Sequence, residues 1–394
     1  MEWRKDLGFS DRLRTIQSLT TAYQQTSSTA AFAEAQAQAR RLENEAYDQA
    51  TSKEEYDRMG QHGIDAAETT KSVVPDTHLN QAEVAPQELD LTIEPSIGEK
   101  FGQYTSCFHH FDGLHSTIYK SKAEDGTVCA VKITVPHLMT APHDAHREAR
   151  LLREASNPHV ISLIESFMLD GGRFVLVFPF LRYDLDHLLR RDMVTATQLR
   201  SILRDLFKAL AHIHTLGIIH RDIKPSNILL DSPNGPAYLA DFGISWREGD
   251  PGSEPVNQKI TDVGTTCYRP PEILFGDRGY GPALDLWAAG CIVAEGIAVG
   301  HRQLFDSGPV GSDLSLISSI FQALGTPDER SWPGAHKLPD WGKVEFHRFP
   351  GQAWDDILPG ASSNGRDLSR QLLCYESSQR LSAAEALGHP YFST

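Results

Sequence analysis

The stretch HRDIKPSN, His220–Asn227, constrains the fold of this chain more than any other part of its sequence. Its aspartate is followed nineteen residues later by DFG, at Asp241–Gly243, and a strand-like run upstream ends in CAVK, at Lys132. Further along the chain come YRPPE, which ends at Glu272, and DLWAAG, which begins at Asp285. Any one of these short motifs is weak evidence, because it is common enough to occur by chance. Their order along the chain, with a strand at the lysine and loops at the others, is highly specific.

The pattern of the sequence changes along the chain. From about residue 95 it shows strand-like runs such as CAVKITV and RFVLVF, and after about residue 195 helical patterns dominate. A sheet-rich lobe followed by a helix-rich lobe is an α+β arrangement, which we expect over residues 95–393. The chain has 394 residues, of which 40% are hydrophobic, and this is enough for a sizeable core.

Residues 1–65 are expected to form a small three-helix bundle ahead of this domain. Apolar residues recur there at helical spacing. SKEE, Ser52–Glu55, has the spacing of a capping box and opens a third helix, which Gly60 and Gly63 are expected to weaken. Residues 66–94 are polar, contain prolines and show no sustained period, so they are expected to form a linker.

Charge and cysteine usage argue against several classes of partner. The formal net charge of −15 argues against bulk electrostatic binding to nucleic acid or to an anionic membrane. The five cysteines form no CxxC pair, so neither a zinc site nor a disulfide framework is indicated, and a reducing intracellular compartment fits. The most apolar run, LWAAGCIVAEGIAVG, contains Glu295 and follows Asp285, so we expect a buried helix rather than a membrane span.

The ordered motifs resemble those of eukaryotic protein kinases, and the resemblance covers roughly residues 95–393. It implies a bilobal fold, ATP and Mg²⁺ as cofactors, and a protein hydroxyl as the phosphate acceptor. Phosphoryl transfer requires the protein to position the reactants and to neutralise charge, and it requires little covalent chemistry by the protein. The residues that the resemblance places in the catalytic machinery are Lys132, Glu148, Asp222, Lys224 and Thr265.

Each of these residues has an expected role in phosphoryl transfer. Lys132 would reach the α- and β-phosphates of ATP, held by Glu148 on the following helix. Asp222 would orient the substrate hydroxyl and accept its proton. Lys224 would neutralise the transferring phosphate, and a lysine there resembles serine/threonine kinases rather than tyrosine kinases. Thr265 would tie Asp222 and Lys224 to the substrate pocket.

Two further sets of residues would hold the nucleotide and its metal ion. Asp241 and Asn227 would supply the hard oxygen ligands that Mg²⁺ prefers. The expected ATP-binding residues are Gly113, Ser116, Ile118, Ala130, Lys132, Phe178, Pro179, Leu181, Asp184 and Leu229. Away from the reaction, Glu272 would pair with Arg380 as a buried ion pair, and Asp285 would hold the backbone of the His-Arg-Asp turn.

The stretch GTPDERSWPG, Gly325–Gly334, resembles an insert of the cyclin-dependent kinases, which places the domain in the cyclin-dependent-kinase-like branch. The helix with Glu148 lacks the cyclin-binding signature, so cyclin dependence is left open. In this and in its irregular nucleotide loop the chain is similar to fungal single-subunit kinases that activate cyclin-dependent kinases. The resemblance implies a role in the cell cycle or in transcription, in the nucleus and/or the cytoplasm, with the nucleus favoured.

The stretch ARRLENEAYDQATSKEEYDRM, Ala39–Met59, is similar to the third-helix entry of KIX-type domains. Such domains bind amphipathic acidic segments of transcription activators through a groove between helices. The candidate groove residues are Leu13, Ile16, Tyr47, Tyr56 and Met59. The alternative is that these residues form the core of the bundle.

The loop expected to cover the phosphates, DGLHSTIYK, holds one glycine. Aligned on its tyrosine and lysine, the usual glycine positions are occupied by Phe111, Gly113 and Ser116. The middle position lies nearest the phosphates, so we expect ATP to bind and to be used. Two hypotheses follow. The favoured one is an active serine/threonine kinase with an N-terminal recruitment module, and the alternative is a pseudokinase scaffold with an eroded loop.

The segment 241–272 contains a candidate phosphorylation site, Thr261, four residues before Thr265. A phosphate there would add about two negative charges. The arginines that would receive that charge are Arg147, Arg221 and Arg247. The alternative is an unphosphorylated loop, and the acidic residues that would substitute in part for the phosphate are then Glu248, Asp250 and Glu254. Gly264 is expected to supply a positive φ angle.

Overall fold

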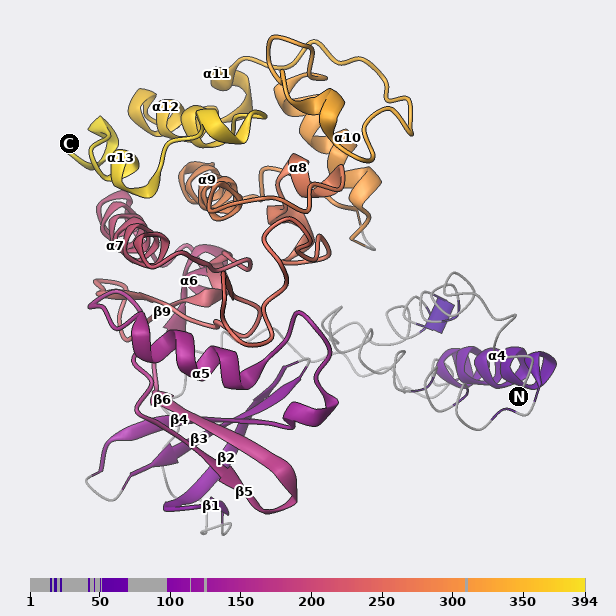
Figure 1. Ribbon diagram of the computed structural model, residues 1–394, viewed down its shortest axis with the longest axis vertical. Coiled ribbons are helices and arrows are strands. Elements are labelled where there is room, and N and C mark those ends of the chain that lie inside the picture. The colour runs from indigo at the N-terminus through magenta and orange to yellow at the C-terminus, as the bar shows by residue number, and fades with distance from the viewer. Residues whose placement is uncertain are drawn as a thin grey trace, which may run out of the picture. The chain divides into compact units, whose positions relative to one another are not determined.

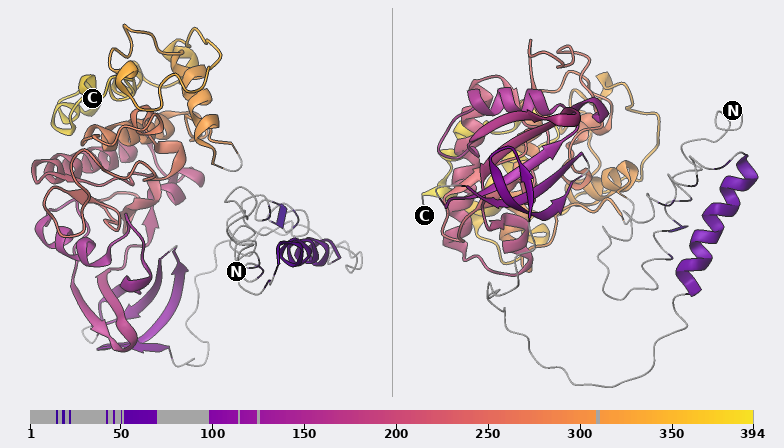
Figure 2. Two further views of the ribbon diagram at one scale, coloured as in Figure 1. Left: turned by 45° about the vertical axis from the view of Figure 1, so that its right-hand side comes forward. Right: turned by 90° about the horizontal axis from the view of Figure 1, so that it is seen from below.

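The computed structural model describes residues 15, 18–19, 22, 42, 46, 50, 52–69, 98–113, 115–123, 126–308 and 311–393. The chain divides into two compact units, Met1–Thr92 and Ile93–Thr394 (Figure 1). In the second unit a β-rich lobe is followed along the chain by a helical lobe, which Figure 2 shows from two further directions. The predicted α+β class of this unit is confirmed.

The first unit contains helix α4, Lys53–Thr69. The helix begins where the sequence predicts, because the Ser52 hydroxyl accepts a hydrogen bond from the backbone N–H of Glu55 at 3.2 Å. It continues to Thr69, past the expected end of the domain at residue 65.

Gly60 and Gly63 do not end α4, although the sequence predicts that they weaken it. A Cβ atom on Gly60 would lie 2.9 Å from Cγ2 of Thr15, and one on Gly63 would lie 2.9 Å from Cδ2 of Leu19. The two glycines therefore let the helix approach its neighbours closely. We infer that this packing outweighs the propensity cost of about 1 kcal/mol per glycine.

The candidate groove residues of this unit are only partly described. Tyr56 is fully buried in a small apolar cluster, and Met59 packs against that cluster. Leu13, Ile16 and Tyr47 lie outside the described residues. The three-helix bundle and its KIX-like groove therefore stay predictions.

The β-rich lobe is a six-stranded antiparallel sheet in the order β1-β2-β3-β4-β6-β5. Its strands are β1 (Glu99–Phe101), β2 (Tyr104–Asp112), β3 (Ser116–Lys122), β4 (Val128–Thr134), β5 (Glu165–Leu169) and β6 (Arg173–Pro179). Helix α5, Ala145–Glu154, follows β4 along the chain and packs on one face of this sheet (Figure 1).

Strand β6 shows how the sheet buries both of its faces. Phe174 and Leu176 pack in the cluster beneath α5, whereas Val175 and Val177 belong to the apolar cluster of the opposite face. Successive side chains of a strand point to opposite faces, so a central strand covered on both sides needs a continuous apolar run. The run RFVLVF provides it.

The helical lobe surrounds the largest apolar core of the unit. Its helices are α6 (Leu185–Arg190), α7 (Ala196–Thr215), α8 (Pro271–Leu274), α9 (Ala283–Ile297), α10 (Asp313–Leu324), α11 (Trp354–Ile357), α12 (Ser363–Leu372) and α13 (Ala383–Leu387). Its short strands are β7 (Tyr183–Asp184), β8 (Ile218–Ile219), β9 (Ile228–Leu230), β10 (Ala237–Leu239) and β11 (Trp246–Arg247). The 3₁₀ turns of the unit are Pro136–Leu138, Asp170–Gly172, Pro225–Asn227, Thr266–Tyr268, Ala335–Lys337, Ser377–Gln379 and Pro390–Phe392.

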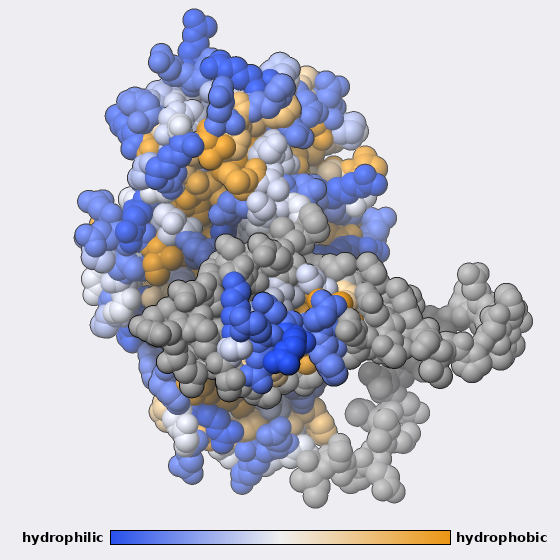
Figure 3. All heavy atoms as spheres, turned by 90° about the vertical axis from the view of Figure 1, so that its right-hand side faces the viewer, coloured by the Kyte–Doolittle hydropathy of each residue, from blue (hydrophilic) through white to orange (hydrophobic). Residues whose placement is uncertain are grey.

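Helix α9 carries the most apolar run of the sequence and is buried along almost its whole length. This confirms the expectation of a buried helix. Within the described residues, every helix is too short or too polar to span a lipid bilayer. On the face of the molecule in Figure 3, hydrophobic residues form small patches among hydrophilic ones, as is ordinary for a protein surface.

Candidate active site

The catalytic stretch His220–Asn227 connects β8 to β9 and is anchored by Asp285 of α9. The buried carboxylate of Asp285 accepts hydrogen bonds from the backbone N–H groups of His220 and Arg221, each at 2.9 Å. Arg221 has a φ angle of 72°, a left-handed conformation that a residue with a long side chain rarely adopts. Asp285 therefore holds the His-Arg-Asp turn in a strained form, as the sequence predicts.

The imidazole of His220 links the catalytic stretch to the DFG segment. Its Nε2 lies 3.0 Å from the carbonyl oxygen of Ala240, and its Nδ1 accepts a hydrogen bond from the backbone N–H of Asp222 at 3.3 Å. These partners require a neutral ring with its proton on Nε2. Burial lowers the pKa of His220, which favours the neutral form. The ring also packs against Phe242, with 4.8 Å between the centroids.

The carboxylate of Asp222 is fixed by contacts on both of its oxygens. Oδ1 accepts hydrogen bonds from the backbone N–H and the hydroxyl of Thr265, each at 3.0 Å. Oδ2 pairs with Nζ of Lys224 at 2.8 Å and accepts a hydrogen bond from Nδ2 of Asn227 at 3.2 Å. Lys224 also donates to the Thr265 hydroxyl at 3.1 Å. The structure thus brings together Asp222, Lys224 and Thr265.

Gly264 lets the segment before Thr265 approach the catalytic stretch. Its φ angle is 74°, and a Cβ atom at this position would lie 2.6 Å from the carbonyl oxygen of Arg221. Both observations require glycine, because an L side chain would be strained and would collide with the backbone. The expected positive φ is therefore confirmed.

A second group of charges surrounds Lys132 of β4. Its Nζ lies 2.8 Å from Oε1 of Glu148 on α5 and 2.9 Å from Oδ1 of Asp241. Burial alone would lower the pKa of Lys132, but the carboxylates of Asp241 and Glu148 outweigh burial and raise it. The Lys132 ammonium in turn holds the pKa of Asp241 well below its usual range. Lys132 and Asp241 are therefore both charged at neutral pH.

The DFG segment is joined to α5 through the backbone as well. The N–H of Asp144 donates to the C=O of Gly243 at 3.0 Å, and the Asp144 carboxylate caps α5 by accepting from the N–H of Arg147 at 2.9 Å. A Cβ atom on Gly243 would lie 3.4 Å from Oδ1 of Asp241 and 3.5 Å from Oε2 of Glu148. The start of α5 and the DFG segment are thus held in one arrangement.

The chemistry of Asp241 and Asn227 fits a magnesium ion. The Asp241 side chain is 47% exposed and carries a second oxygen besides the one on Lys132. The amide nitrogen of Asn227 donates to the carbonyl and carboxylate oxygens of Asp222, so the amide oxygen is left for another partner. In the part of the chain that the structure describes, no three His, Cys, Asp or Glu side chains gather as a metal cage. Mg²⁺ is usually bound by a few protein oxygens, and phosphate oxygens of the substrate complete its coordination.

The residues expected around the adenine lie on adjoining strands. Ile118 of β3 is in register with the catalytic lysine of β4, and Ala130 of β4 is opposite Phe178 of β6. Leu229 of β9 is opposite Asp184 of β7. The contact of these residues with ATP stays a prediction. The strand pairings place them opposite one another, as that prediction requires.

The segment after β6 is the predicted hinge, and its contact with a purine base stays a prediction. Pro179 ends the strand, and the N–H of Phe180 donates to a carbonyl at the start of β4 at 3.2 Å. Among the described residues, no backbone–backbone hydrogen bond uses the N–H or C=O of Leu181, so both groups are left for the base. The Asp184 carboxylate accepts from the N–H of His187 at 2.7 Å and so caps α6.

Two side chains that the sequence motifs do not single out stand beside this segment. The ring of His110 lies 5.2 Å from the ring of Phe180, and Nζ of Lys120 lies 4.4 Å from the same centroid. Lys120 lies two residues after Ile118 and therefore on the same face of β3. The alternation of side chains along a strand would have predicted its position beside the expected nucleotide pocket. Burial and the Lys120 charge lower the pKa of His110.

The glycine-poor loop is a tight turn between β2 and β3. The N–H of Gly113 donates to the carbonyl oxygen of Ser116 at 2.7 Å. A Cβ atom on Gly113 would lie 3.1 Å from Oγ and 3.3 Å from the carbonyl oxygen of Ser116. Phe111, at the outer glycine position, is 58% exposed. A side chain at the middle position would therefore be crowded, and Ser116 would have to shift slightly to make room for it.

A cavity of about 440 Å³ adjoins this turn but is not the expected nucleotide pocket. Gly113 and Ser116 line it, together with Thr117, Tyr119 and Ile133. The side chains of Thr117, Tyr119 and Ile133 point to the face of the sheet opposite that of Ile118 and Lys132, because side chains alternate along each strand.

Two predicted features of the activation segment can be placed. Glu272 forms a buried bidentate pair with Arg380, at 2.6 and 2.7 Å, as predicted. Thr261 is half-buried, and its carbonyl oxygen accepts a hydrogen bond from the N–H of Val263 at 3.0 Å. Its phosphorylation stays a prediction.

The comparisons with known proteins agree with this geometry. The protein kinase domain family matches residues 112–392. Serine/threonine-protein kinase csk1 of Schizosaccharomyces pombe is 35% identical over 285 residues, which cover 71% of this chain and 92% of the relative. Cyclin-dependent kinase 20 of Danio rerio is 36% identical, covering 74% of this chain and 84% of the relative. Cyclin-dependent kinase 7 of Xenopus laevis is 37% identical, covering 74% and 81% respectively.

The fold, the paired charges and these relatives define a protein kinase, and the chain belongs to the cyclin-dependent-kinase-like branch of that family. It is an ATP-dependent serine/threonine protein kinase. Kinases of this family use ATP with Mg²⁺ and act on protein substrates.

Proposed function

We propose that this kinase phosphorylates serine and threonine hydroxyls of proteins that act in the cell cycle or in transcription. The carrying observation for the chemistry is the Asp222 carboxylate, which Thr265, Lys224 and Asn227 hold within 3.2 Å. The likeness to cyclin-dependent kinases supports the regulatory role. On the same ground we propose the nucleus as the favoured location, with the cytoplasm as the alternative.

Within this proposal the chain's own groups have separate tasks. Asp222 orients the substrate hydroxyl and accepts its proton, because its carboxylate is already held at both oxygens. Lys224 stands 2.8 Å from that carboxylate and neutralises charge on the transferring group. Lys132, held by Glu148, positions the nucleotide phosphates. Mg²⁺ held by Asn227 and Asp241 supplies further neutralisation of phosphate charge when it is bound.

Cyclin independence is part of the same proposal. A kinase of this fold works when the lysine of β4 pairs with the glutamate of α5 and the DFG aspartate is in place. The proposal is supported by Lys132, whose Nζ lies within 3.0 Å of both Glu148 and Asp241 in the chain by itself. We therefore expect α5 to hold its working position without a cyclin.

For the first unit we propose recruitment of an amphipathic acidic segment of a transcription-related protein. Its support is the KIX-like stretch Ala39–Met59 and the apolar cluster around Tyr56. The test is fluorescence anisotropy of labelled acidic amphipathic peptides titrated with the full chain. We expect micromolar binding that is lost in Met59→Glu and kept in Arg58→Gln. Equal binding by the two variants would contradict the groove.

The alternative function, a pseudokinase scaffold, rests on the glycine-poor turn alone. Phosphate transfer from labelled Mg-ATP to a generic basic protein, with and without a panel of cyclins, separates the two functions. We expect transfer by the full chain without any cyclin and none by Asp222→Asn. Transfer that appears only after a cyclin is added would overturn the proposed independence, and no transfer under any condition would leave the scaffold.

A further inference from the structure

Arg147 and Arg221 lie buried where α5 meets the catalytic stretch and the activation segment, and each is only 1% exposed. A buried guanidinium destabilises the fold by several kcal/mol, as a rough figure, unless a partner compensates its charge. The groups that contact these arginines therefore decide how the activation segment, residues 241–272, is held. Either a phosphate or the segment's own carboxylates can provide the charge.

Glu254 is the partner of Arg221. Nη1 and Nη2 of Arg221 lie 3.1 Å from Oε1 and Oε2 of Glu254, which is a bidentate, charge-assisted pair. Burial would raise the pKa of Glu254, but the hydrogen bonds and the charge of Arg221, together with backbone hydrogen bonds, outweigh burial and lower it, so the carboxylate is charged. Arg221 directly precedes Asp222, and the pair therefore fixes the turn that carries the catalytic aspartate.

The backbone around Glu254 is fixed as well. Its carbonyl oxygen accepts a hydrogen bond from Nε1 of Trp246 at 2.8 Å. Oε1 also lies 3.5 Å from the backbone N–H of Ile260, the residue before the candidate phosphorylation site. Glu254 thus joins the early and late halves of the activation segment to the catalytic stretch.

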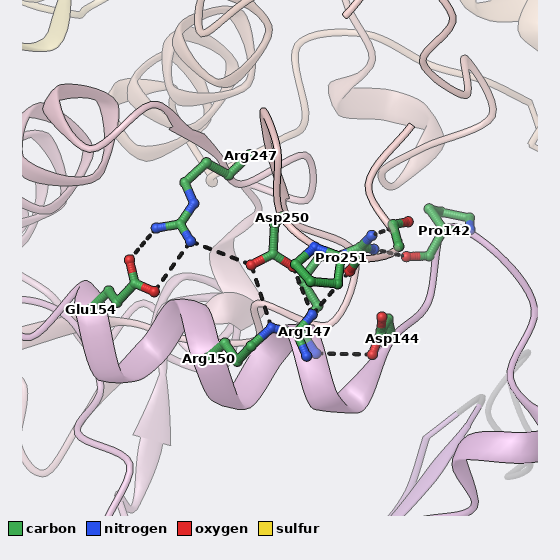
Figure 4. A network of polar contacts seen from close by, with 9 residues as sticks. Pro142, Asp144, Arg147, Arg150, Glu154, Arg247, Asp250 and Pro251 are labelled. Atoms are coloured by element: carbon green, nitrogen blue, oxygen red, sulfur yellow. Dashed lines mark hydrogen bonds and ion pairs between the residues drawn. The ribbon is translucent and has the colours of Figure 1, made fainter. Parts of the chain in front are cut away.

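Asp250 ties the same segment to helix α5 (Figure 4). Its buried carboxylate pairs with Nη2 of Arg150 at 2.7 Å and lies 3.4 Å from Nη2 of Arg247. Nη1 and Nη2 of Arg247 also contact the carboxylate of Glu154, at the end of α5. Arg150 and Glu154 of α5 therefore form one charge network with Arg247 and Asp250 of the segment, and Arg147 of the same helix joins the segment through the carbonyl oxygen of Gly252.

Arg147 binds backbone carbonyls rather than a carboxylate, one of them in the activation segment and the other just before α5, and its Nε has no hydrogen-bond partner within the described part of the chain. Its Nη1 donates to the carbonyl oxygen of Gly252 at 2.9 Å, and its Nη2 donates to the carbonyl of Pro142. Among the described residues, the side-chain hydrogen bonds of Arg147 and Arg221 go to Gly252, Pro142 and Glu254, and Thr261 is not among these partners.

We propose that Glu254 and Asp250 are positioning residues that hold the activation segment in its working arrangement in place of a phosphorylated side chain. Together they bring two negative charges, that of Glu254 to Arg221 and that of Asp250 to Arg150 and Arg247, and a phosphoryl group brings about 1.5 to 2 at neutral pH. Through Arg221 and α5 they fix Asp222 and Glu148. This inference rests on the proposed phosphoryl transfer and adds that the segment needs no phosphate.

The first test measures the kinase activity of the full chain after phosphatase treatment. Mass spectrometry verifies that residues 241–272 carry no phosphate. We expect this protein and Thr261→Ala to have kcat values within about twofold of untreated protein, because the carboxylates already compensate the arginines. Activity that appears only after an upstream kinase phosphorylates the segment would overturn the inference and leave the proposed function standing. Inactivity of every form would overturn both.

The second test removes the carboxylate itself. Glu254→Gln should lower kcat about tenfold or more while the KM for ATP changes less than about twofold, because Arg221 is left buried and unpaired beside Asp222. The matched control is Glu248→Gln, which removes the same charge from an exposed position of the same segment and should leave kcat unchanged. Equal kcat values for Glu254→Gln and Glu248→Gln would contradict the role of Glu254.

A third measurement covers the case in which Glu254→Gln is poorly folded. Hydrogen exchange of the full-length variants reports the α5 amides separately from the rest of the domain. Asp250→Asn should speed exchange within Ala145–Glu154 and leave α9 unchanged, because Asp250 pairs with Arg150 of α5. Unchanged exchange in α5 would show that Asp250 does not position this helix.

Discussion

The catalytic stretch and the phosphate-covering turn of this kinase are held in different ways. In His220–Asn227 the Asp222 carboxylate has partners on both oxygens, and Asp285 holds the backbone behind it. In the described part of the turn between β2 and β3, the N–H of Gly113 donates to the carbonyl oxygen of Ser116, and Phe111 is exposed at the outer glycine position.

The difference shows which part of this kinase depends on the positions of its side chains. The catalytic stretch places the groups that act on the substrate hydroxyl, and a displaced carboxylate or ammonium loses its function there. The turn acts through its backbone and needs a residue without Cβ only at the close approach. Gly113 stands where a Cβ atom would crowd Ser116, whereas Phe111 and Ser116 occupy the other two glycine positions.

The largest expected effect is that of Asp222→Asn. The amide cannot accept the substrate proton, so kcat should fall by about a thousandfold or more. The KM for ATP should stay within about threefold, because Asp222 contacts Thr265 and Lys224 rather than the nucleotide. Steady-state kinetics checks both values, with exposed Asp231→Asn as the control. A variant with near wild-type kcat would remove Asp222 from the role of base.

A smaller effect is expected at the turn. Gly113→Val should raise the KM for ATP about tenfold, because its Cβ would crowd both Oγ and the carbonyl of Ser116 and a β-branched side chain cannot yield. The fall in kcat should be less than the rise in KM. Gly281→Val is the matched control, since a Cβ atom at Gly281 meets open space. An unchanged KM at Gly113→Val would place the phosphate cover elsewhere in the sequence.

Ser116→Gly tests the same turn in the opposite direction. The substitution removes the oxygen that stands 3.1 Å from a Cβ at position 113 and restores a glycine of the family pattern. We expect the KM for ATP to fall by about two- to threefold with kcat unchanged. A rise in KM would show that the Ser116 hydroxyl itself contributes to nucleotide binding.

The smallest effect is expected from pH. The pKa of Lys132 is raised and that of Asp241 is lowered, so both stay charged: the lysine below its folded pKa and the aspartate above its own. The kcat/KM for ATP should therefore vary less than about twofold between about pH 7 and 9. A pH–rate profile with an inflection in this range that shifts in Lys132→Arg would show that the lysine titrates there.

Much of the site could be predicted because its residues sit in short motifs with fixed spacing. HRDIKPSN alone places Asp222, Lys224 and Asn227 within a few residues, and local geometry then brings them together. The pairing of Lys132 with Glu148 was also predictable, because strand β4 and helix α5 follow one another along the chain. The buried helix α9 followed from its uninterrupted apolar run.

The rest depends on contacts between distant segments. The sequence offers Glu248, Asp250 and Glu254 as equivalent acids, and only the folded segment shows that Glu254 reaches Arg221 while Glu248 is exposed. The position of His110 beside Phe180 likewise requires the register of strands far apart in the chain. The persistence of α4 through its glycines reflects packing that helix propensity does not contain.

The measurement that tests the account most directly is steady-state ATP kinetics of the purified full chain, without cyclin, on a generic basic protein. The account predicts phosphotransfer with kcat of order 1 s⁻¹ or more, together with a KM for ATP that Gly113→Val raises. Tight ATP binding with no transfer above the level of the Asp222→Asn variant would contradict it, because the catalytic stretch would then be intact without being used.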